Sequence, residues 1–329
     1  MKPFHELTRL GIIRRLRQVA WKALQAYDLK VAKMEFLTID TNTMFKVRSD
    51  QGERYVMRIY SEEETTPREN QAEMFWLNAL IQDTDLHVVE PIPRRDGDFI
   101  TPVQVMGVPG ERRCALFKWI PGRPLEEHLS TENYCKLGMI SAKLHNHAAS
   151  LPTLPQEIQP KKWDRVFYYP DEPVVYDKPG YHHLFPYKRL SLLNRVIEKS
   201  QTLFSRLFSE QGDPILIHGD LHFWNVHVHH GELYIIDFED ISLGYPIQDI
   251  AVTLYYGRDR KDYPSLVKAL KRGYTGIRPW PDESQETIET LMAARAVNFI
   301  NYVARVDNSP GDFIKRKCRD LEAYLEQYP

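Results

Sequence analysis

Between residues 215 and 238, Asp220, Asn225 and Asp237 carry oxygen-bearing side chains whose types and spacing suit the transfer of a phosphoryl group. Asp220 and Asn225 belong to a polar stretch that follows the apolar run Ile215–Ile217, and Asp237 follows the next apolar segment. A carboxylate can orient an attacking hydroxyl and accept its proton, and carboxylate and amide oxygens are the ligands that Mg²⁺ prefers. Asp220 is therefore a candidate base, and Asn225 and Asp237 are candidate metal ligands.

The neighbouring elements should bring these residues together. Residues 226–228 and 233–236 are typical of short strands, and the turn His229-His230-Gly231 between them predicts a hairpin. We expect the hairpin to return Asp237 to the loop that contains Asp220 and Asn225. Their spacing matches the catalytic loop and metal-binding aspartate of protein kinases.

The segment His218-Gly219-Asp220-Leu221-His222, with Asn225 and Ile236-Asp237-Phe238, resembles the aminoglycoside phosphotransferase and choline kinase superfamily, a phosphotransferase enzyme family. The resemblance implies an α+β, bilobal, protein-kinase-like fold, with an N-terminal antiparallel-sheet lobe and a larger, mainly helical C-terminal lobe. It also implies an ATP-dependent kinase that uses Mg²⁺ and phosphorylates a small-molecule hydroxyl; GTP is the alternative nucleotide.

The resemblance extends to nucleotide-binding positions in the N-terminal lobe. Tyr55-Val56-Met57-Arg58 is similar to the strand that presents a phosphate-binding lysine, although the cation here is arginine. Glu73 lies where the helix partner of that cation is expected, and a surface ion pair between Arg58 and Glu73 is the alternative. Phe117-Lys118-Trp119-Ile120 resembles the interlobe hinge that holds adenine. The implied nucleotide-binding residues are Arg58, Glu73, Phe117 and Trp119.

Two departures from the protein-kinase pattern leave alternatives open. The N-terminal lobe has no G-x-G-x-x-G loop, and Asp40-Thr41-Asn42-Thr43 could cover the phosphates instead. Glu239 and Asp240 follow Phe238 where protein kinases have glycine, and these carboxylates either face the substrate or cap the following turn. Asp249 is implied to brace the catalytic loop, and His145 is expected to be a packed or hydrogen-bonded helix residue.

Apolar spacing gives the elements that position these residues. It predicts helices over residues 8–27, 67–81 and 132–148, and strands near residues 33–39, 44–48, 54–60, 99–105 and 113–119. A connector rich in Pro and Gly follows the last strand, so we expect a nucleotide-binding lobe over residues 1–118 and a catalytic and substrate lobe over residues 119–329. Residues 152–186 show little periodicity and predict an irregular segment.

The resemblance implies that this irregular segment helps to build the acceptor pocket. It carries aromatic and acidic side chains: Trp163, Asp164, Phe167, Tyr168, Tyr169, Asp171, Glu172, Tyr176 and Asp177. Aromatic faces and carboxylates suit an ammonium group, which favours a hydroxylated amine such as an aminoglycoside, an amino alcohol or a homoserine-like compound. A solvated, partly packed insertion is the alternative, because Lys161, Lys162, Arg165 and Lys178 dilute the acidic character.

The composition of the chain limits the classes of partner that it is expected to bind. Among its 329 residues, 43 basic and 45 acidic side chains give a net charge of −2, so no overall field attracts nucleic acid or an anionic membrane. The three cysteines, Cys114, Cys135 and Cys318, suggest neither a disulfide framework nor a zinc knuckle. The first residues lack the apolar core of a signal peptide, and no apolar stretch is long enough to cross a bilayer. We expect a cytoplasmic protein.

Three other functions compete with a small-molecule kinase. A protein Ser/Thr kinase of the stress-response type would share the motif, and so would a nucleotide-binding pseudokinase with a regulatory role. A metallohydrolase is suggested by a group of five neighbouring histidines: His218, His222, His227, His229 and His230. We expect instead that His218 fixes the loop and that His229 and His230 form a turn.

Overall fold

The computed structural model describes residues 2–61, 65–169, 173–281 and 283–329, and it divides the chain into two compact units. The first unit comprises Met1–Arg123, Leu154–Gln159 and His227–Glu239. The second unit comprises Pro124–Thr153, Pro160–Val226 and Asp240–Pro329. The lobe boundary between residues 118 and 119 stays a prediction.

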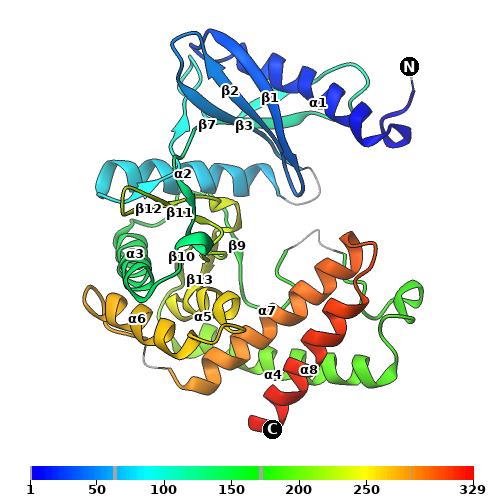
Figure 1. Cartoon of the computed structure of the whole chain (residues 1–329), viewed down its shortest axis with the longest axis vertical. Helices are drawn as coiled ribbons and strands as arrows, with labels where there is room; N and C mark the ends of the chain where they lie inside the picture. Colours follow the sequence, from blue (N-terminus) through cyan, green and yellow to red (C-terminus); the bar gives the residue numbers. More distant parts are fainter. Residues whose placement is uncertain (1, 62–64, 170–172, 282) are drawn as a thin grey trace. The chain divides into compact units, whose positions relative to one another are not determined.

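The first unit is built on an antiparallel sheet (Figure 1). Its strand order is β1 (Val31–Ile39), β2 (Thr43–Ser49), β3 (Arg54–Ile59), β7 (Arg112–Lys118) and β5 (Pro91–Ile92), with β6 (Thr101–Val103) also paired to β7. Alternate residues of β2 are buried, as expected for a strand with one face against a core. The sheet thereby places Arg58 of β3 and Phe117 of β7 on neighbouring strands.

Two helices complete this unit. Helix α1 (Arg9–Leu24) begins at Thr8, whose hydroxyl accepts a hydrogen bond from the amide of Gly11. Its buried face joins the sheet residues Phe45 and Val47 in one hydrophobic core. Helix α2 (Pro67–Asp83) begins with a capping box between Thr66 and Glu69 and contributes Glu73 to the interior.

A hairpin from the later chain belongs to the same unit. Strand β11 (Val226–His229) pairs with β12 (Glu232–Ile235), and β12 also pairs in parallel with β4 (His87–Val88). The turn residues His230 and Gly231 have φ angles of 50° and 83°. Positive φ at both central residues is the signature of a type I′ turn, whose twist suits a two-residue hairpin. The predicted hairpin is confirmed.

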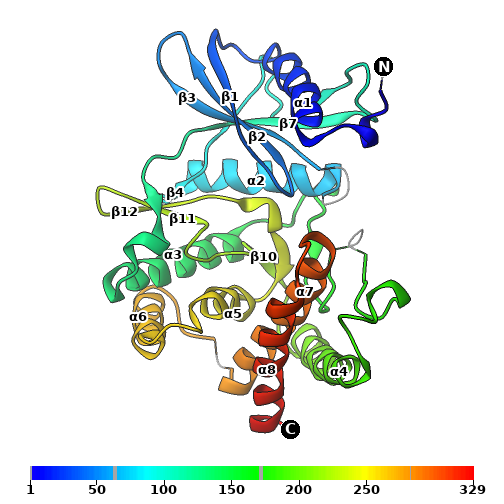
Figure 2. The same ribbon diagram turned by 45° about the vertical axis from the view of Figure 1, so that its right-hand side comes forward.

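The second unit is mainly helical (Figure 2). Its helices are α3 (Thr131–Ser150), α4 (Tyr187–Glu210), α5 (Pro246–Gly257), α6 (Tyr263–Thr275), α7 (Gln285–Val306) and α8 (Gly311–Gln327). Helix α3 packs against α6, and α7 packs against α4, α5 and α8. A small sheet has the order β10 (Ile215–Ile217), β13 (Ser242–Gly244) and β9 (Lys161–Lys162). Strand β8 (Arg123–Pro124) falls where the sequence passes from the first unit to the second.

The elements expected from apolar spacing are present with small shifts at their ends. The predicted helices correspond to α1, α2 and α3, and the five predicted strands correspond to β1, β2, β3, β6 and β7. The segment over residues 152–186 is largely irregular, with strand β9 and a short 3₁₀ helix over Pro179–Tyr181 among its described residues. The predicted pocket residues Asp171 and Glu172 lie outside the described residues.

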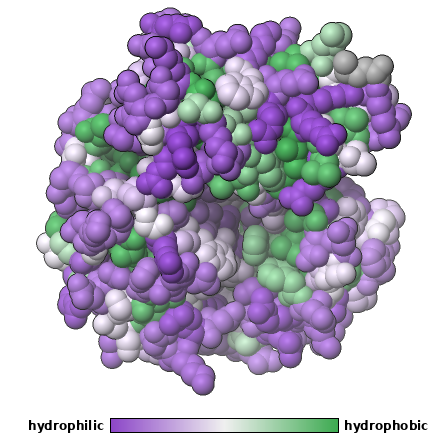
Figure 3. Space-filling view, turned by 45° about the horizontal axis from the view of Figure 1, so that its top comes forward, coloured by the Kyte–Doolittle hydropathy of each residue, from purple (hydrophilic) through white to green (hydrophobic). Residues whose placement is uncertain are grey.

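Polar side chains dominate the face of the molecule seen in Figure 3, and hydrophobic patches are scattered between them. The exposed large hydrophobic residues include Leu10, Met106 and Tyr187, which lie far apart in the sequence. In the part of the chain that the structure describes, no helix combines the length and hydropathy needed to span a membrane.

Candidate active site

The catalytic loop, residues 218–225, connects β10 to β11 and brings Asp220 and Asn225 together in the second unit. The side-chain amide of Asn225 donates to the Asp220 backbone oxygen at 2.9 Å and lies 3.1 Å from its Oδ2. His222 Nε2 also lies 3.1 Å from this Oδ2. The loop therefore fixes one oxygen of the Asp220 carboxylate through its own side chains.

Gly219 explains how the backbone can turn immediately before Asp220. Its φ angle is 80°, a conformation that side chains with a Cβ rarely adopt. A Cβ at this position would lie 2.2 Å from the backbone oxygen of Asp240. The loop therefore requires glycine here both for its conformation and for the close approach of the two chain segments.

Asp249, at the start of α5, braces the catalytic loop through hydrogen bonds to its backbone, as predicted. Its side chain is fully buried and accepts hydrogen bonds from the amides of His218 at 2.8 Å and Gly219 at 2.7 Å. His145 Nε2 lies 3.1 Å away, and its other ring nitrogen lies 2.9 Å from the hydroxyl of Tyr274. Burial by itself raises the pKa of Asp249, but His145 and the loop amides outweigh it and hold the pKa below its usual value.

Arg295, which was not predicted from the sequence, contacts the other oxygen of the Asp220 carboxylate. Arg295 of α7 places a guanidinium nitrogen 2.6 Å from Oδ1, and the Tyr256 hydroxyl lies 3.5 Å from the same atom. Burial alone would raise the pKa of Asp220, but the charges of His222 and Arg295 outweigh it and hold the pKa well below the usual range. The signal in the sequence was a single arginine within an otherwise apolar helical run.

The predicted pair Arg58 and Glu73 is buried in the first unit, so the alternative of a surface ion pair is wrong. The side chains are 6% and 1% exposed, and their closest nitrogen–oxygen distance is 2.7 Å. The Tyr60 hydroxyl donates to the second Glu73 oxygen at 2.7 Å. Arg58 also lies 3.4 Å from Oδ1 of Asp237, so the structure brings these predicted residues into one cluster.

Asp237 and Arg58 lie at a cavity of about 270 Å³ within the first unit. Apart from these charged residues, Lys118 and His227, its lining is hydrophobic: Leu37, Met44, Val56, Val89, Phe117, Trp119, Ile120 and Ile236. Asp237 has a φ angle of 66°, which is uncommon for a residue with a side chain and is frequent at functional sites. An apolar cavity with a cation and a carboxylate in its lining suits a flat, apolar ring that carries phosphate groups.

The two carboxylates after Phe238 make different contacts. Glu239 accepts hydrogen bonds from the side chains of Thr41, at 3.3 Å, and Asn42, both in the turn after β1. Asp240 accepts a hydrogen bond from the Tyr169 hydroxyl at 2.7 Å and lies 3.5 Å from Lys161 Nζ. Glu239 therefore connects to the predicted phosphate loop, whereas Asp240 connects to the irregular segment.

Some members of the irregular segment pack inside the second unit. Trp163 is 1% exposed and stacks on Tyr168 with 4.9 Å between ring centroids. Asp164 lies 4.0 Å from Lys162 and 3.5 Å from Arg165. These contacts favour the packed alternative for Trp163 and show that cations of the same segment neighbour the Asp164 carboxylate.

An exposed aromatic face lies on the catalytic loop instead. Trp224 is 44% exposed, and its ring centroid lies 5.5 Å from those of both Tyr256 and His222. Tyr256 and His222 in turn contact Asp220. Of the other clustered histidines, His230 forms part of the hairpin turn described above.

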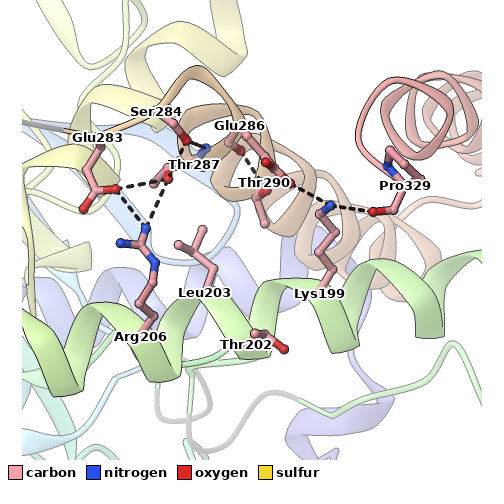
Figure 4. A pocket seen from close by; sticks show the side chains of 10 residues that line it. All are labelled: Lys199, Thr202, Leu203, Arg206, Glu283, Ser284, Glu286, Thr287, Thr290 and Pro329. Carbon is pink, nitrogen blue, oxygen red and sulfur yellow. Dashed lines mark hydrogen bonds and ion pairs between the residues drawn. The ribbon is translucent and has the colours of Figure 1, made fainter.

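Another cavity in the second unit, of about 650 Å³, is lined by α4, the first turns of α7 and the end of the chain (Figure 4). Its charged side chains pair with one another: Arg206 lies 2.8 Å from Glu283, and Lys199 lies 2.8 Å from Glu286. These pairs join the two helices, and we assign the cavity no role in catalysis.

Comparison with known families shows which family the chain belongs to. Residues 40–284, more than half of the chain, match the sequence model of the phosphotransferase enzyme family. The chain belongs to this family. The range contains the catalytic loop, the Arg58 cluster and all of the lining of the cavity beside it except Leu37, and the resemblance based on the motif is confirmed.

Two curated relatives of this phosphotransferase are named as kinases. It is 23% identical over 246 residues to the amicoumacin kinase of Bacillus subtilis (strain 168), covering 72% of this chain and 67% of that protein. It is 25% identical over 297 residues to the homoserine kinase of Gluconobacter oxydans (strain 621H), covering 87% of this chain and 86% of the relative.

Solved structures agree on the fold. An amicoumacin kinase in complex with AMP-PNP, Ca²⁺ and Ami has a TM-score of 0.79 at 18% identity, with 96% of each chain covered. A microcompartment-associated aminopropanol kinase has a TM-score of 0.74 at 22% identity, covering 94% of this chain and 98% of the other. The predicted α+β, bilobal, kinase-like fold is thereby confirmed, and the chain is a phosphotransferase enzyme.

Proposed function

We propose that this phosphotransferase transfers the γ-phosphoryl group of ATP, with Mg²⁺, to a hydroxyl group of a small molecule. The observation that carries the proposal is the partly buried pairing of Asp220 with Asn225 within one loop, at the spacing that phosphoryl transfer uses. Asp220 orients the acceptor hydroxyl and accepts its proton. The contacts of Asn225 and His222 fix the carboxylate before the acceptor arrives.

The first unit supplies the proposed nucleotide-binding residues. Phe117 and Trp119 line the apolar cavity, which fits a purine ring, and Arg58 lines it as the cation for the phosphates. Glu73 holds Arg58 in place through the buried ion pair. Arginine keeps its charge at every relevant pH, so it can replace the usual lysine as a phosphate-binding group.

The proposed metal ligands are Asp237 and Asn225, both with hard oxygen donors. The amide nitrogen of Asn225 donates to Asp220, which directs the nitrogen inward and leaves the amide oxygen as the donor for a metal. A bound Mg²⁺ would neutralise charge on the transferring phosphates. Asp237 contributes a carboxylate whose side chain is one-third exposed and therefore accessible.

We further propose that the acceptor is a hydroxylated amine: an aminoglycoside, an amino alcohol or a homoserine-like compound. Relatives and structural neighbours named as amicoumacin, aminopropanol and homoserine kinases support this class. The exposed indole of Trp224 on the catalytic loop also supports it, because an aromatic face attracts an ammonium group. Trp224 replaces the buried Trp163 as the aromatic residue that we assign to acceptor binding.

A coupled ADP-release screen tests both proposals, with matched pairs of amino and deaminated hydroxyl compounds as acceptors. Asp220→Asn should abolish most turnover and retain ATP binding. Trp224→Ala should raise the KM for the amine by about tenfold, whereas Trp21→Ala, at a similarly exposed tryptophan of α1, should not change it.

The outcomes separate the competing functions. Turnover of Asp220→Asn close to that of the wild type would refute the catalytic assignment. A preference for the deaminated compounds would refute the amine class and leave the kinase assignment standing. ATP binding without turnover of any acceptor would favour a pseudokinase, and phosphorylation of added protein alone would favour a protein kinase.

A further inference from the structure

Arg295 is a buried charge in the interior of the second unit. It lies in α7 between Ala294 and Ala296, and it is 6% exposed. A guanidinium without a partner is costly to bury, so such a residue is retained where a carboxylate compensates it. The partner here is the proposed catalytic base, Asp220, rather than a residue with a structural role only.

The contact between Arg295 and Asp220 is short and directional. A terminal nitrogen of Arg295 donates to Asp220 Oδ1 at 2.6 Å, and the same nitrogen lies 3.3 Å from the Tyr256 hydroxyl. The other terminal nitrogen lies 3.5 Å from the hydroxyl of Tyr168. The guanidinium is therefore itself held by two tyrosines while it holds the carboxylate.

Two different elements fix the two oxygens of Asp220. The catalytic loop contacts Oδ2 through His222 and Asn225, each at 3.1 Å, and α7 contacts Oδ1 through Arg295. A carboxylate that is fixed at one oxygen can still rotate about its Cβ–Cγ bond. Contacts at both oxygens fix the plane of the carboxylate and the direction of the lone pairs that remain for an acceptor hydroxyl.

We propose that Arg295 is a positioning residue that fixes the carboxylate of Asp220 for the acceptor hydroxyl. This inference rests on the proposed function, because it requires that Asp220 acts on the acceptor. Arg295 acts through Asp220 and contributes to the rate of transfer rather than to nucleotide binding. A misalignment of about 1 Å at a reacting group lowers rates by roughly 100-fold, which sets the size of the expected effect.

A chain of hydrogen bonds connects this contact to the irregular segment. The Tyr168 hydroxyl lies 3.2 Å from that of Tyr169, which donates to Asp240 at 2.7 Å. Lys161 Nζ, also buried, lies 3.5 Å from Asp240. The packing of the segment thus supports the orientation of Arg295, and this gives the buried tyrosines a function beyond filling the interior.

A double-mutant cycle tests the proposal. We compare Arg295→Gln, Arg295→Lys, Asp220→Asn and the double variant Arg295→Gln/Asp220→Asn with the wild type. Arg258→Gln is the matched control, because Arg258 forms a 3.0 Å ion pair with Glu289 and so also joins a neighbouring element to α7. For each protein the measurements are kcat, the KM values for ATP and acceptor, the Kd for ATP by calorimetry, and the Tm.

Arg295→Gln should lower kcat by about 100-fold and leave the Kd for ATP within about twofold. Arg295→Lys should recover part of the rate, because lysine keeps the charge and loses the fork of donors. In the Asp220→Asn background, Arg295→Gln should change the residual rate by no more than about twofold, since its route of action is already removed. Arg258→Gln should retain the wild-type kcat.

Several results would overturn the inference. Unchanged kcat in Arg295→Gln would refute it, even if the Tm values show that the two residues are coupled, because the role would then be structural. Multiplicative losses in the double variant would show that Arg295 acts independently of Asp220. A wild-type protein that turns over no acceptor would refute the proposed function and this inference together, whereas a kcat loss shared by Arg258→Gln would refute this inference alone.

Discussion

Asn42 donates its side-chain amide to the carboxylate of Glu239, and this contact ties the turn after β1 to the residue two positions beyond Asp237. Thr41 contacts the other Glu239 oxygen at 3.3 Å, and Arg58 lies 3.9 Å from the oxygen that Asn42 contacts. The turn has no glycine-rich sequence, so its position depends on side-chain contacts. A carboxylate where protein kinases have glycine therefore helps to order the predicted phosphate loop.

Glu239→Ala should loosen this turn. The loss of hydrogen bonds to a charged group costs about 1.5–3 kcal/mol, so local opening should become at least roughly tenfold more frequent. Hydrogen–deuterium exchange of the ligand-free protein should then be faster over residues 40–43. Glu239→Gln keeps an acceptor for Asn42 and should show a smaller change. Equal exchange in all three proteins would mean that the turn is ordered by its backbone alone.

Removing one partner of the Arg58–Glu73 pair should destabilise the first unit strongly. Both side chains are buried, so Glu73→Leu removes the closest carboxylate from the guanidinium and leaves it the more distant Asp237 and Glu239, at a cost toward the lower end of about 3–5 kcal/mol. The double variant Arg58→Met/Glu73→Leu should recover most of this loss in urea unfolding. Glu35→Gln breaks an exposed pair with Lys33 and should change the free energy of unfolding little. Equal costs for the buried and exposed pairs would contradict the argument.

The sequence predicted the parts of the site that depend on neighbouring residues. Asp220 and Asn225 lie in one loop, and the hairpin turn at His230-Gly231 has its own local signature, so both followed from local pattern. Arg58 and Glu73 were found because the family resemblance supplied their pairing.

Contacts between distant segments could not be derived in this way. Arg295 meets Asp220 across 75 positions of sequence, and only the packing of α7 decides which carboxylate a lone buried arginine will meet. Trp163 was expected near the acceptor because the resemblance implies a pocket there and the segment is rich in aromatic and acidic residues, yet it stacks on Tyr168 in the interior. In an irregular segment no period indicates which side chains face the core, so burial depends on tertiary contacts.

Asp237→Ala should raise the Mg²⁺ concentration needed for half-maximal activity by at least about tenfold, because it removes a proposed ligand. Calorimetry should also show weaker binding of ATP in the presence of Mg²⁺ and a smaller change in its absence. Asp262→Ala, at an exposed aspartate paired with Arg260, serves as the control. An unchanged Mg²⁺ requirement would argue against the metal-binding role of Asp237.

Asp249→Asn should reveal a pH-dependent contribution to stability. The pKa of Asp249 is lower in the folded protein than its ordinary value, because His145 and the amides of His218 and Gly219 favour the charged form. A group with a lowered folded pKa stabilises the fold above its unfolded pKa, about 3.9, and the contribution disappears as the pH falls through the folded pKa. The wild type should therefore lose this contribution only in acid.

The difference in Tm between the wild type and Asp249→Asn should be large and nearly constant from about pH 5 to pH 7 and should shrink below about pH 4. Asparagine cannot accept from both loop amides with its two terminal atoms, since one of them is a donor, so the variant lacks a hydrogen bond at every pH. His145→Ala should show a similar trend at a smaller amplitude, because it removes one partner of the carboxylate and retains the amides. A difference in Tm that grows as the pH falls would show that Asp249 is protonated more readily in the folded protein than in the unfolded chain, and the proposed brace of the catalytic loop by a charged carboxylate would then be wrong.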